Sequence, residues 1–254
     1  MRYFVRLSYN GAGFHGWQTQ PNALSVQQKI EESLSIVLRT PVTIVGAGRT
    51  DAGVHAKEMF AHFDLPFQIN DKSKLLISLN RLVGKNIAFY EIFEVSEEAH
   101  ARFDATERTY KYFVCYEKTP FLYPFAWHSP SILNLRKMNE AAKLLLSVDD
   151  FTSFAKLHSD VKTNICHVSQ AIWTEHVDEM PLMGRGIVFT ITANRFLRNM
   201  VRAIVGTLVD VGREKISLIE FDQIIKSKNR CSAGISMPAE GLFLWKIKYP
   251  YTSC

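Results

Sequence analysis

The chain has 254 residues, of which 47% are hydrophobic and 22% charged, and this composition excludes a disordered, collagen-like or fibrous protein. Its net charge is +5, and the excess lies in the second half: residues 1–105 carry 11 basic and 11 acidic side chains, whereas residues 106–254 carry 19 and 14. A one-sided positive charge favours a polyanionic partner, with chance clustering as the alternative.

The cysteines and the apolar runs indicate the compartment. None of the four cysteines has a Cys-x-x-Cys neighbour, which argues against a zinc site and a disulfide framework and favours a reduced cytoplasmic protein. The first ten residues alternate like a strand rather than forming a signal peptide. No apolar run approaches the roughly 20 residues that cross a bilayer. We expect a soluble chain with no membrane partner.

Hydrophobic periodicity predicts six elements in the first half. They are strands at 2–9, 42–46, 58–65 and 87–95, and helices at 26–38 and 75–83. The first helix follows Ser25, which stands three residues before Gln28 in a capping-box pattern. The resulting order β-α-β-β-α-β is typical of a ferredoxin-like unit.

The second half repeats this theme less regularly. It contains predicted strands at 109–116, 164–176, 187–193 and 243–249, a helix at 134–146 and a helical stripe from 197 to 208 that ends near Gly212. We therefore predict an α+β fold with two ferredoxin-like or RNP-like halves, 1–105 and 106–254. Their antiparallel or mixed sheets are expected to meet at a central active-site cleft.

The densest candidate site is the segment GAGRTDAGVHA, residues 46–56. Its glycines permit unusual backbone angles and close approach of a large ligand. Asp51, beside Arg49, is a candidate nucleophile or general base. The segment lacks the third glycine of a dinucleotide fingerprint and the Gly-Lys-Ser/Thr of a P-loop. The alternative is a tight turn whose Asp caps its own backbone.

Two basic clusters are candidate RNA contacts. In the first, residues 101–114, basic and aromatic side chains interleave, so that phosphates could be held while a ring stacks on a base. Its members are Arg102, Arg108, Lys111, Phe103, Tyr110 and Tyr112. In the second, the spacing of Arg195, Arg198 and Arg202 predicts one side of a helix N-terminal region. The alternatives are a half-buried strand with snorkelling cations and a set of solvated arginines.

Arg202 stands within an apolar stripe, where burial is costly unless a carboxylate pairs with it, and Asp51 is one possible partner. Other chemistries lack their patterns. The histidines have no metal-ligand spacing, and no Gly-x-Ser-x-Gly elbow of a serine hydrolase is present.

Several segments together resemble the tRNA pseudouridine synthase A family (TruA) over almost the full length. The segment at 46–56 is similar to its signature, and the chain also carries an R-x-Y-x-Y strand and an FLxxMVR helix. The strand motif lies at 108–112 and the helix motif at 196–202. An opening SYNG-FHGWQ at 8–18 and a closing PAEGLFL at 238–244 accompany them. Asn10 stands where the family usually has Asp.

This resemblance implies a function: isomerisation of uridine to pseudouridine at positions 38–40 of the tRNA anticodon stem-loop, by a homodimer without metal or cofactor. It implies that Asp51 is the nucleophile, that Arg49 displaces the target base, and that Tyr110 stacks on the uracil. Arg202 would pair with Asp51, and Leu242 would line the uridine site. We assign RNA binding to Arg102, Arg108 and Arg198.

Two other classes remain open from the sequence. A non-catalytic RNA-binding module with RNP-like sheets predicts that Asp51→Asn changes neither tRNA binding nor cellular phenotype. An Asp-dependent enzyme acting on small nucleosides predicts turnover of free uridine without tRNA, but such a substrate would not need the basic second half.

Overall fold

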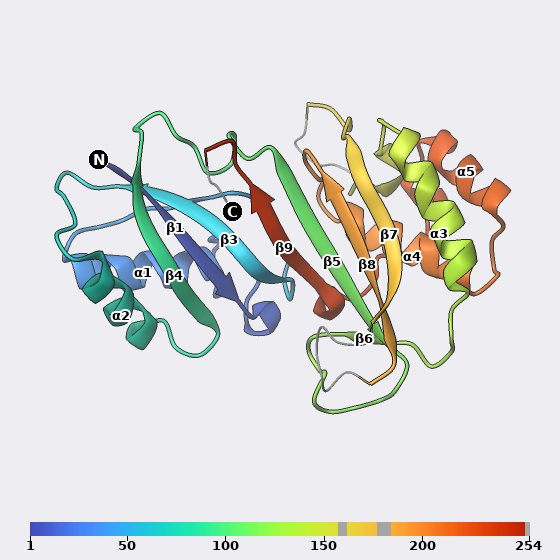
Figure 1. Cartoon of the computed structure of the whole chain (residues 1–254), viewed down its shortest axis with the longest axis horizontal. Helices are drawn as coiled ribbons and strands as arrows, with labels where there is room; N and C mark the ends of the chain where they lie inside the picture. Colours follow the sequence, from blue (N-terminus) through green and yellow to red (C-terminus); the bar gives the residue numbers. More distant parts are fainter. Residues whose placement is uncertain (157–161, 177–183, 252–254) are drawn as a thin grey trace. The chain divides into compact units, whose positions relative to one another are not determined.

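The computed structural model describes residues 1–156, 162–176 and 184–251. The chain divides into two compact units: Met1–Thr106 together with Phe243–Cys254, and Glu107–Leu242. In the described ranges it contains nine strands, mostly antiparallel, and five α-helices (Figure 1). The predicted α+β class is confirmed, whereas the arrangement as two ferredoxin-like halves stays a prediction.

The first unit follows the predicted order of elements. It contains β1 (Arg2–Tyr9), α1 (Val26–Leu38), β2 (Val45–Gly46), β3 (His55–Asp64), α2 (Lys72–Leu82) and β4 (Ile87–Val95). β1 pairs antiparallel with β3 on one side and β4 on the other. The last strand of the chain, β9 (Leu242–Lys248), runs parallel to the start of β3. The edge of β3 that carries the candidate loop is thus shared with a strand from the far end of the sequence.

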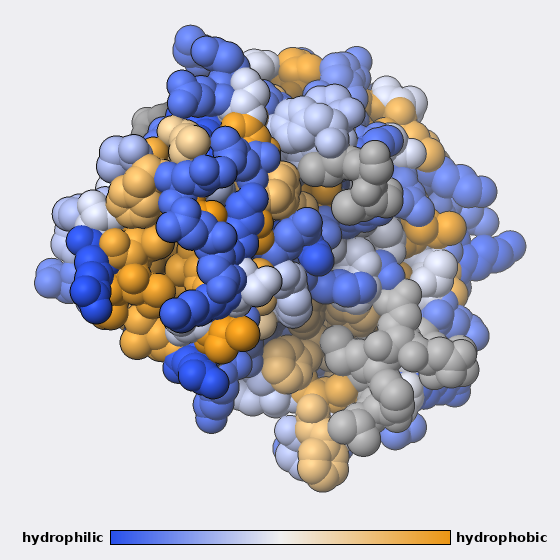
Figure 2. Space-filling view, turned by 60° about the vertical axis from the view of Figure 1, so that its left-hand side comes forward, coloured by the Kyte–Doolittle hydropathy of each residue, from blue (hydrophilic) through white to orange (hydrophobic). Residues whose placement is uncertain are grey.

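The first helix begins where the sequence predicts, because the Ser25 side chain accepts a hydrogen bond from the Gln28 N–H, and it ends at the left-handed residue Arg39. α1 and α2 lie side by side and bury apolar stripes (Figure 1). Each also leaves an isoleucine exposed, Ile36 on α1 and Ile77 on α2. Figure 2, which brings this side forward, shows apolar areas within a mostly hydrophilic face.

The strand predicted at 42–46 is shorter in the structure, where only Val45 and Gly46 pair with β3. Side chains of α1 take the backbone donors that a longer ladder would use. The Val42 N–H donates to Ser35 Oγ, and the Ile44 N–H donates to Glu31 Oε1, each at 2.9 Å.

The second unit contains a three-stranded antiparallel sheet with β8 at its centre. Its elements are β5 (Glu107–Cys115), β6 (Trp127–His128), α3 (Leu135–Leu144), β7 (Val168–His176), β8 (Gly186–Ala193), α4 (Met200–Gly212) and α5 (Leu218–Ser227). β8 pairs with β5 and β7, and the short β6 runs parallel to β5. The three helices pack together, with α3 against β7 (Figure 1).

One helix prediction in this unit needs correction, and one helix was not predicted. The helix expected from 197 begins at Met200, because Asn199 adopts a left-handed conformation with φ +65°. Arg195 and Arg198 therefore precede the helix instead of sharing a side of it with Arg202. α5 was not predicted, although its capping box between Ser217 and Glu220 is a sequence signal.

Of the residues that the structure describes, no helix combines the length and apolar character needed to cross a membrane.

The buried histidine of β3 gives a pH prediction. His62 is 5% exposed, and its Nδ1 accepts a hydrogen bond from the Ala101 N–H. Burial, aided by Arg2 and His100, lowers the pKa of His62 from 6.5 to about 4. Between these values the unfolded chain binds a proton that the folded chain excludes. We expect the free energy of unfolding to fall by up to roughly 3 kcal/mol from this group as the pH drops from 7 to 4.

Urea titrations across this range measure the effect. His62→Gln keeps an acceptor and does not titrate, so the variant should show a shallower pH dependence than the parent. Equal slopes in the two proteins would contradict the assignment to His62.

Candidate active site

Asp51 lies in the connection from β2 to β3, in a turn that is closed by a hydrogen bond between two backbone groups. The Val54 N–H donates to the Asp51 carbonyl at 3.1 Å, and Gly53 has φ +79°. This is the left-handed region that glycine enters without strain. Asp51 is half-buried, so its carboxylate is partly withdrawn from solvent while its backbone is fixed.

The residue before Asp51 is fastened to the segment that follows β1. The Thr50 carbonyl accepts a hydrogen bond from the Trp17 N–H at 3.1 Å. The Thr50 hydroxyl lies 2.8 Å from the Tyr9 hydroxyl, in a buried pair. The carbonyl and the hydroxyl of Thr50 are therefore both hydrogen-bonded, and they hold the backbone next to Asp51 in place.

The same segment also holds the far side of the turn. The Gly53 N–H donates to the Phe14 carbonyl at 3.3 Å, and the Gly11 N–H donates to Nδ1 of the fully buried His55 at 3.0 Å. A Cβ on Gly11 would overlap the Val54 carbonyl. The opening loop is thus the support of the catalytic candidate.

Sequence reasoning gave no role to Tyr9, Gly16 or Trp17 in placing Asp51. Gly16 has φ +91°, and a Cβ there would lie 2.7 Å from the Thr50 carbonyl oxygen. The sequence signal was the clustered glycines and aromatics of SYNGAGFHGWQ, which give no hint that their partners lie in the segment 46–56.

Two glycines of the segment 46–56, which carries Asp51, give a matched stability test. A Cβ on Gly46 would lie 2.5 Å from the Trp17 ring, which is 2% exposed, whereas a Cβ on Gly48 meets nothing within 4 Å. We expect Gly46→Ala to lower the free energy of unfolding by about 2–3 kcal/mol through overpacking, and Gly48→Ala to change it by less than about 0.5 kcal/mol. Urea unfolding of both variants measures this, and equal losses would contradict the packing assignment.

In the second unit, Tyr110 stands on β5 opposite Ile191 of β8 and is half-buried. The Phe196 ring meets the Tyr110 ring edge-on, with centroids 5.1 Å apart and an interplanar angle of 83°. Phe196 belongs to the stretch between β8 and α4. An edge-on contact limits rotation of the Tyr110 ring.

Arg202 lies in the first turn of α4 and is bound to the segment that precedes β9. Its Nε donates to the Met237 carbonyl at 2.5 Å, and its own carbonyl accepts from the Met237 N–H at 3.1 Å. The next carbonyl along, that of Pro238, accepts from the Tyr112 hydroxyl at 3.0 Å. The Arg helix, the tyrosine strand and the closing segment are thus joined.

The buried Tyr112 shows the electrostatic character of this region. Burial raises the pKa of Tyr112 well above its ordinary value, Glu240 raises it further and Arg202 lowers it. Burial also raises the pKa of Glu240. A phenol that stays protonated keeps its hydrogen bond to Pro238, so Tyr112 acts as a structural pin for the closing segment.

The remaining predicted site residues are placed as follows. Arg49, Arg102 and Arg198 are exposed, and the buried Leu242 is the first residue of β9. The Arg108 Nη1 donates to the Asn194 carbonyl at 2.9 Å. The first unit holds Asp51, Arg49 and Arg102, and the second holds Tyr110, Arg108, Arg198, Arg202 and Leu242.

Over the described ranges, no group of three or more histidine, cysteine, aspartate or glutamate side chains has the arrangement of a metal site.

Comparisons with known proteins cover nearly the whole chain. Residues 141–250 match the family model described as tRNA pseudouridine synthase. A protein of Parabacteroides distasonis named tRNA pseudouridine synthase A is 55% identical over 249 residues, which cover 98% of this chain and 96% of that protein. Proteins of the same name from Bacteroides fragilis and Bacillus subtilis are 51% and 37% identical, each over 98% of this chain and over 96% and 99% of their own lengths.

The chain belongs to the tRNA pseudouridine synthase A family.

This member of the tRNA pseudouridine synthase A family has Asn10 in place of the usual Asp, and the hydrogen bond that Asn10 makes is one that either residue can accept. Asn10 Oδ1 accepts from the Ala12 N–H at 3.0 Å and caps the short turn after β1. This contact needs only an acceptor oxygen, which Asn and Asp share.

Arg230 is a further positioning residue in this family member, and no sequence pattern indicated it. Its guanidinium donates to the Gly234 carbonyl at 3.1 Å and to Ser236 Oγ at 2.8 Å. Ser236 Oγ also accepts from Asn199 Nδ2 at 2.5 Å. These contacts hold the segment whose next residue, Met237, binds Arg202. No local pattern marked Arg230, because its partners follow it in an irregular stretch.

Proposed function

We propose that the protein isomerises uridine to pseudouridine in tRNA, at positions 38–40 of the anticodon stem-loop. The observation that carries this proposal is Asp51, half-buried in a loop whose two flanks are hydrogen-bonded to a supporting segment. Family membership supplies the reaction. The non-catalytic RNA-binding module is not favoured, since the relatives are named as synthases over nearly the same length.

The reaction conserves the atoms of the nucleotide. The C1′–N1 bond breaks, the uracil turns over, a C1′–C5 bond forms, and the C5 proton leaves while N1 gains one. An ionised Asp51 attacks C1′ or takes the 2′ proton, and in both routes the carboxylate must be charged. Arg202 is the proposed counter-charge, as a guanidinium pairs strongly with a carboxylate. No cofactor is required.

Substrate placement is assigned to four side chains. A nucleotide inside a stem must leave the stack before its C1′ can be reached. Arg49, which is exposed on the candidate loop, is proposed to fill the gap. Tyr110 stacks on the detached uracil, with Phe196 limiting its rotation. Leu242 lines the apolar side of the uridine site.

RNA binding is assigned to Arg102, Arg108 and Arg198. Supporting this, residues 106–254 carry five more basic than acidic side chains (19 against 14). We propose a cytoplasmic homodimer with one tRNA across both subunits. Free thiols in the described part of the chain support a reducing compartment.

Tritium release from C5-labelled uridine tests the proposal. Unmodified tRNA with uridine only at position 39 within the 38–40 window should release tritium with the purified protein and none when that uridine is replaced by cytidine. Free uridine should release no tritium, and this result distinguishes a tRNA-modifying enzyme from an enzyme that acts on free nucleosides. Absence of release from the position-39 tRNA would overturn the proposal.

A further inference from the structure

An exposed aromatic ring stands in the connection between β4 and β5. Phe103 is 73% exposed, although phenylalanine ordinarily lies inside a protein. His100 backs its ring, with centroids 4.2 Å apart and planes at 34°, and the Arg102 guanidinium carbon is 5.6 Å from the ring centroid. A supported ring and a cation are therefore presented together; we call Phe103, His100 and Arg102 the Phe103 platform.

The backbone around the Phe103 platform is fixed by the His100 side chain. Its Nδ1 accepts from the N–H groups of Arg102 and Phe103 at 3.1 and 3.2 Å. The His100 N–H in turn donates to Asp104 Oδ2 at 2.7 Å, and the Asp104 N–H donates to the His100 carbonyl at 3.0 Å. Residues 100–104 thus form a turn that is closed by hydrogen bonds and that includes Phe103 in its backbone.

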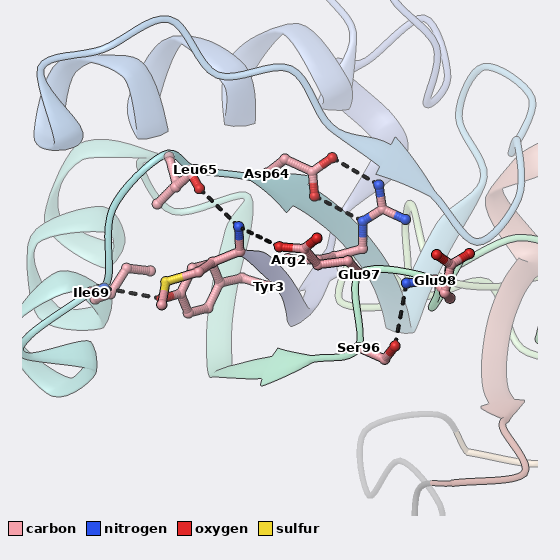
Figure 3. A network of polar contacts seen from close by, with 9 residues as sticks. Arg2, Tyr3, Asp64, Leu65, Ile69, Ser96, Glu97 and Glu98 are labelled. Carbon is pink, nitrogen blue, oxygen red and sulfur yellow. Dashed lines mark hydrogen bonds and ion pairs between the residues drawn. The ribbon is translucent and has the colours of Figure 1, made fainter.

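Residues of β1 and β3, and Tyr249 just after β9, anchor this turn. Ala101 is held at both polar atoms: its N–H donates to His62 Nδ1, and its carbonyl accepts from the Tyr249 hydroxyl. Arg2 donates to the Ala99 carbonyl at 3.0 Å. Asp64 accepts two 2.8 Å hydrogen bonds from the same guanidinium (Figure 3). The conformational entropy of the loop is thus lost on folding, before any ligand binds.

We propose that the Phe103 platform binds an unpaired base of the RNA substrate, with Phe103 stacking on the base and Arg102 contacting its phosphate. This inference rests on the proposed function for the class of ligand. Aromatic rings stack on any base, and arginine adds the phosphate and cation–π contacts of single-strand binding sites.

The Phe103 platform is separate from the Asp51 loop within the first unit. β3 starts at His55, beside that loop, and His62, which supports the platform, stands seven residues further along the strand. At about 3.3 Å per residue the two ends lie roughly 23 Å apart. The platform therefore contacts a different nucleotide from the one that reacts.

A pre-ordered site favours a nucleotide over a second protein chain. Phe103 is a single ring with the charged Arg102 and Asp104 beside it, whereas the centre of a stable protein interface is depleted of charge. The contact between two copies of this chain remains an outcome that the experiment must detect.

Phe103→Ala, Phe103→Trp and a control, Phe121→Ala, test the platform. Phe121 is 71% exposed and lies outside the platform, so its truncation removes a similar exposed ring. Filter binding of unmodified tRNA should show an affinity about 5- to 100-fold lower for Phe103→Ala. Phe103→Trp and Phe121→Ala should stay within about threefold of the parent. The tritium-release rate at saturating tRNA should be unchanged for all three.

Three outcomes of the affinity and sedimentation measurements overturn the platform. Unchanged affinity of Phe103→Ala, or an equal loss in Phe103→Trp, excludes stacking. Dissociation of the Phe103→Ala protein in sedimentation, together with the loss of affinity, assigns Phe103 to a contact between copies. The parent protein separates the two proposals: tRNA binding without tritium release defeats the proposed function alone, and tritium release with normal Phe103→Ala binding defeats the platform alone.

Discussion

Asp51→Asn is expected to abolish pseudouridine formation, lowering the single-turnover rate by at least about 10⁴-fold. The amide has nearly the shape of the carboxylate but neither its charge nor its nucleophilicity. The hydrogen bonds that the Asp51 carbonyl and the neighbouring Thr50 make within the loop and its supporting segment do not depend on this substitution, so these supports remain. The rate is measured by tritium release with enzyme in excess over tRNA.

Binding and folding provide the controls for this variant. The affinity for tRNA should stay within about threefold of the parent, because phosphate contacts dominate affinity. The urea midpoint should also be preserved. Turnover close to that of the parent would remove Asp51 from the reaction, and a collapse of binding with normal turnover on bound RNA would make it an RNA contact.

Arg202→Met is expected to lower the maximal rate by about 10²–10³-fold while tRNA affinity stays within about threefold. Arg202 is half-buried, and its Nε donates to the Met237 carbonyl, so we expect it to act as an internal cation rather than as a phosphate contact. Methionine keeps the packing of the stem but removes the charge. Single-turnover rates and filter binding of the same preparations measure both effects.

Arg198→Met is the matched comparison, because Arg198 is exposed and precedes α4. It should weaken binding at low salt and reduce the slope of log affinity against log salt by about 1, with an unchanged rate on saturating tRNA. Arg202→Met is thus expected to lower the rate alone, and Arg198→Met to lower the affinity alone. If Arg202→Met behaves like Arg198→Met, the counter-charge assignment is wrong.

The local pattern of the chain was sufficient for most elements. β1 and β4 have the predicted bounds, and α1 begins after the predicted cap at Ser25. Periodicity succeeds here because strands and helices expose alternate positions or a single stripe to water. α5 was not predicted, although Ser217 and Glu220 form a capping box of the same kind as the one used at Ser25.

Failures occurred where a distant side chain changed the backbone. Ser35 and Glu31 bind the donors of residues 42 and 44 and so shorten the predicted strand. Asn199 turns left-handed, bonds Ser236 and delays α4 to Met200. These side chain contacts, up to 37 residues apart along the chain, do not show in hydrophobic periodicity.

The sequence by itself determined the α+β class, the family and the candidate chemistry, because periodicity and motifs are properties of neighbouring residues. Only the tertiary structure decided that Thr50 is fastened to Tyr9 and Trp17, that Arg230 braces the segment holding Arg202, and that β9 returns to β3. These contacts join residues far apart along the chain. Which of them form depends on the packing and hydrogen bonding of the folded units, which no local pattern encodes.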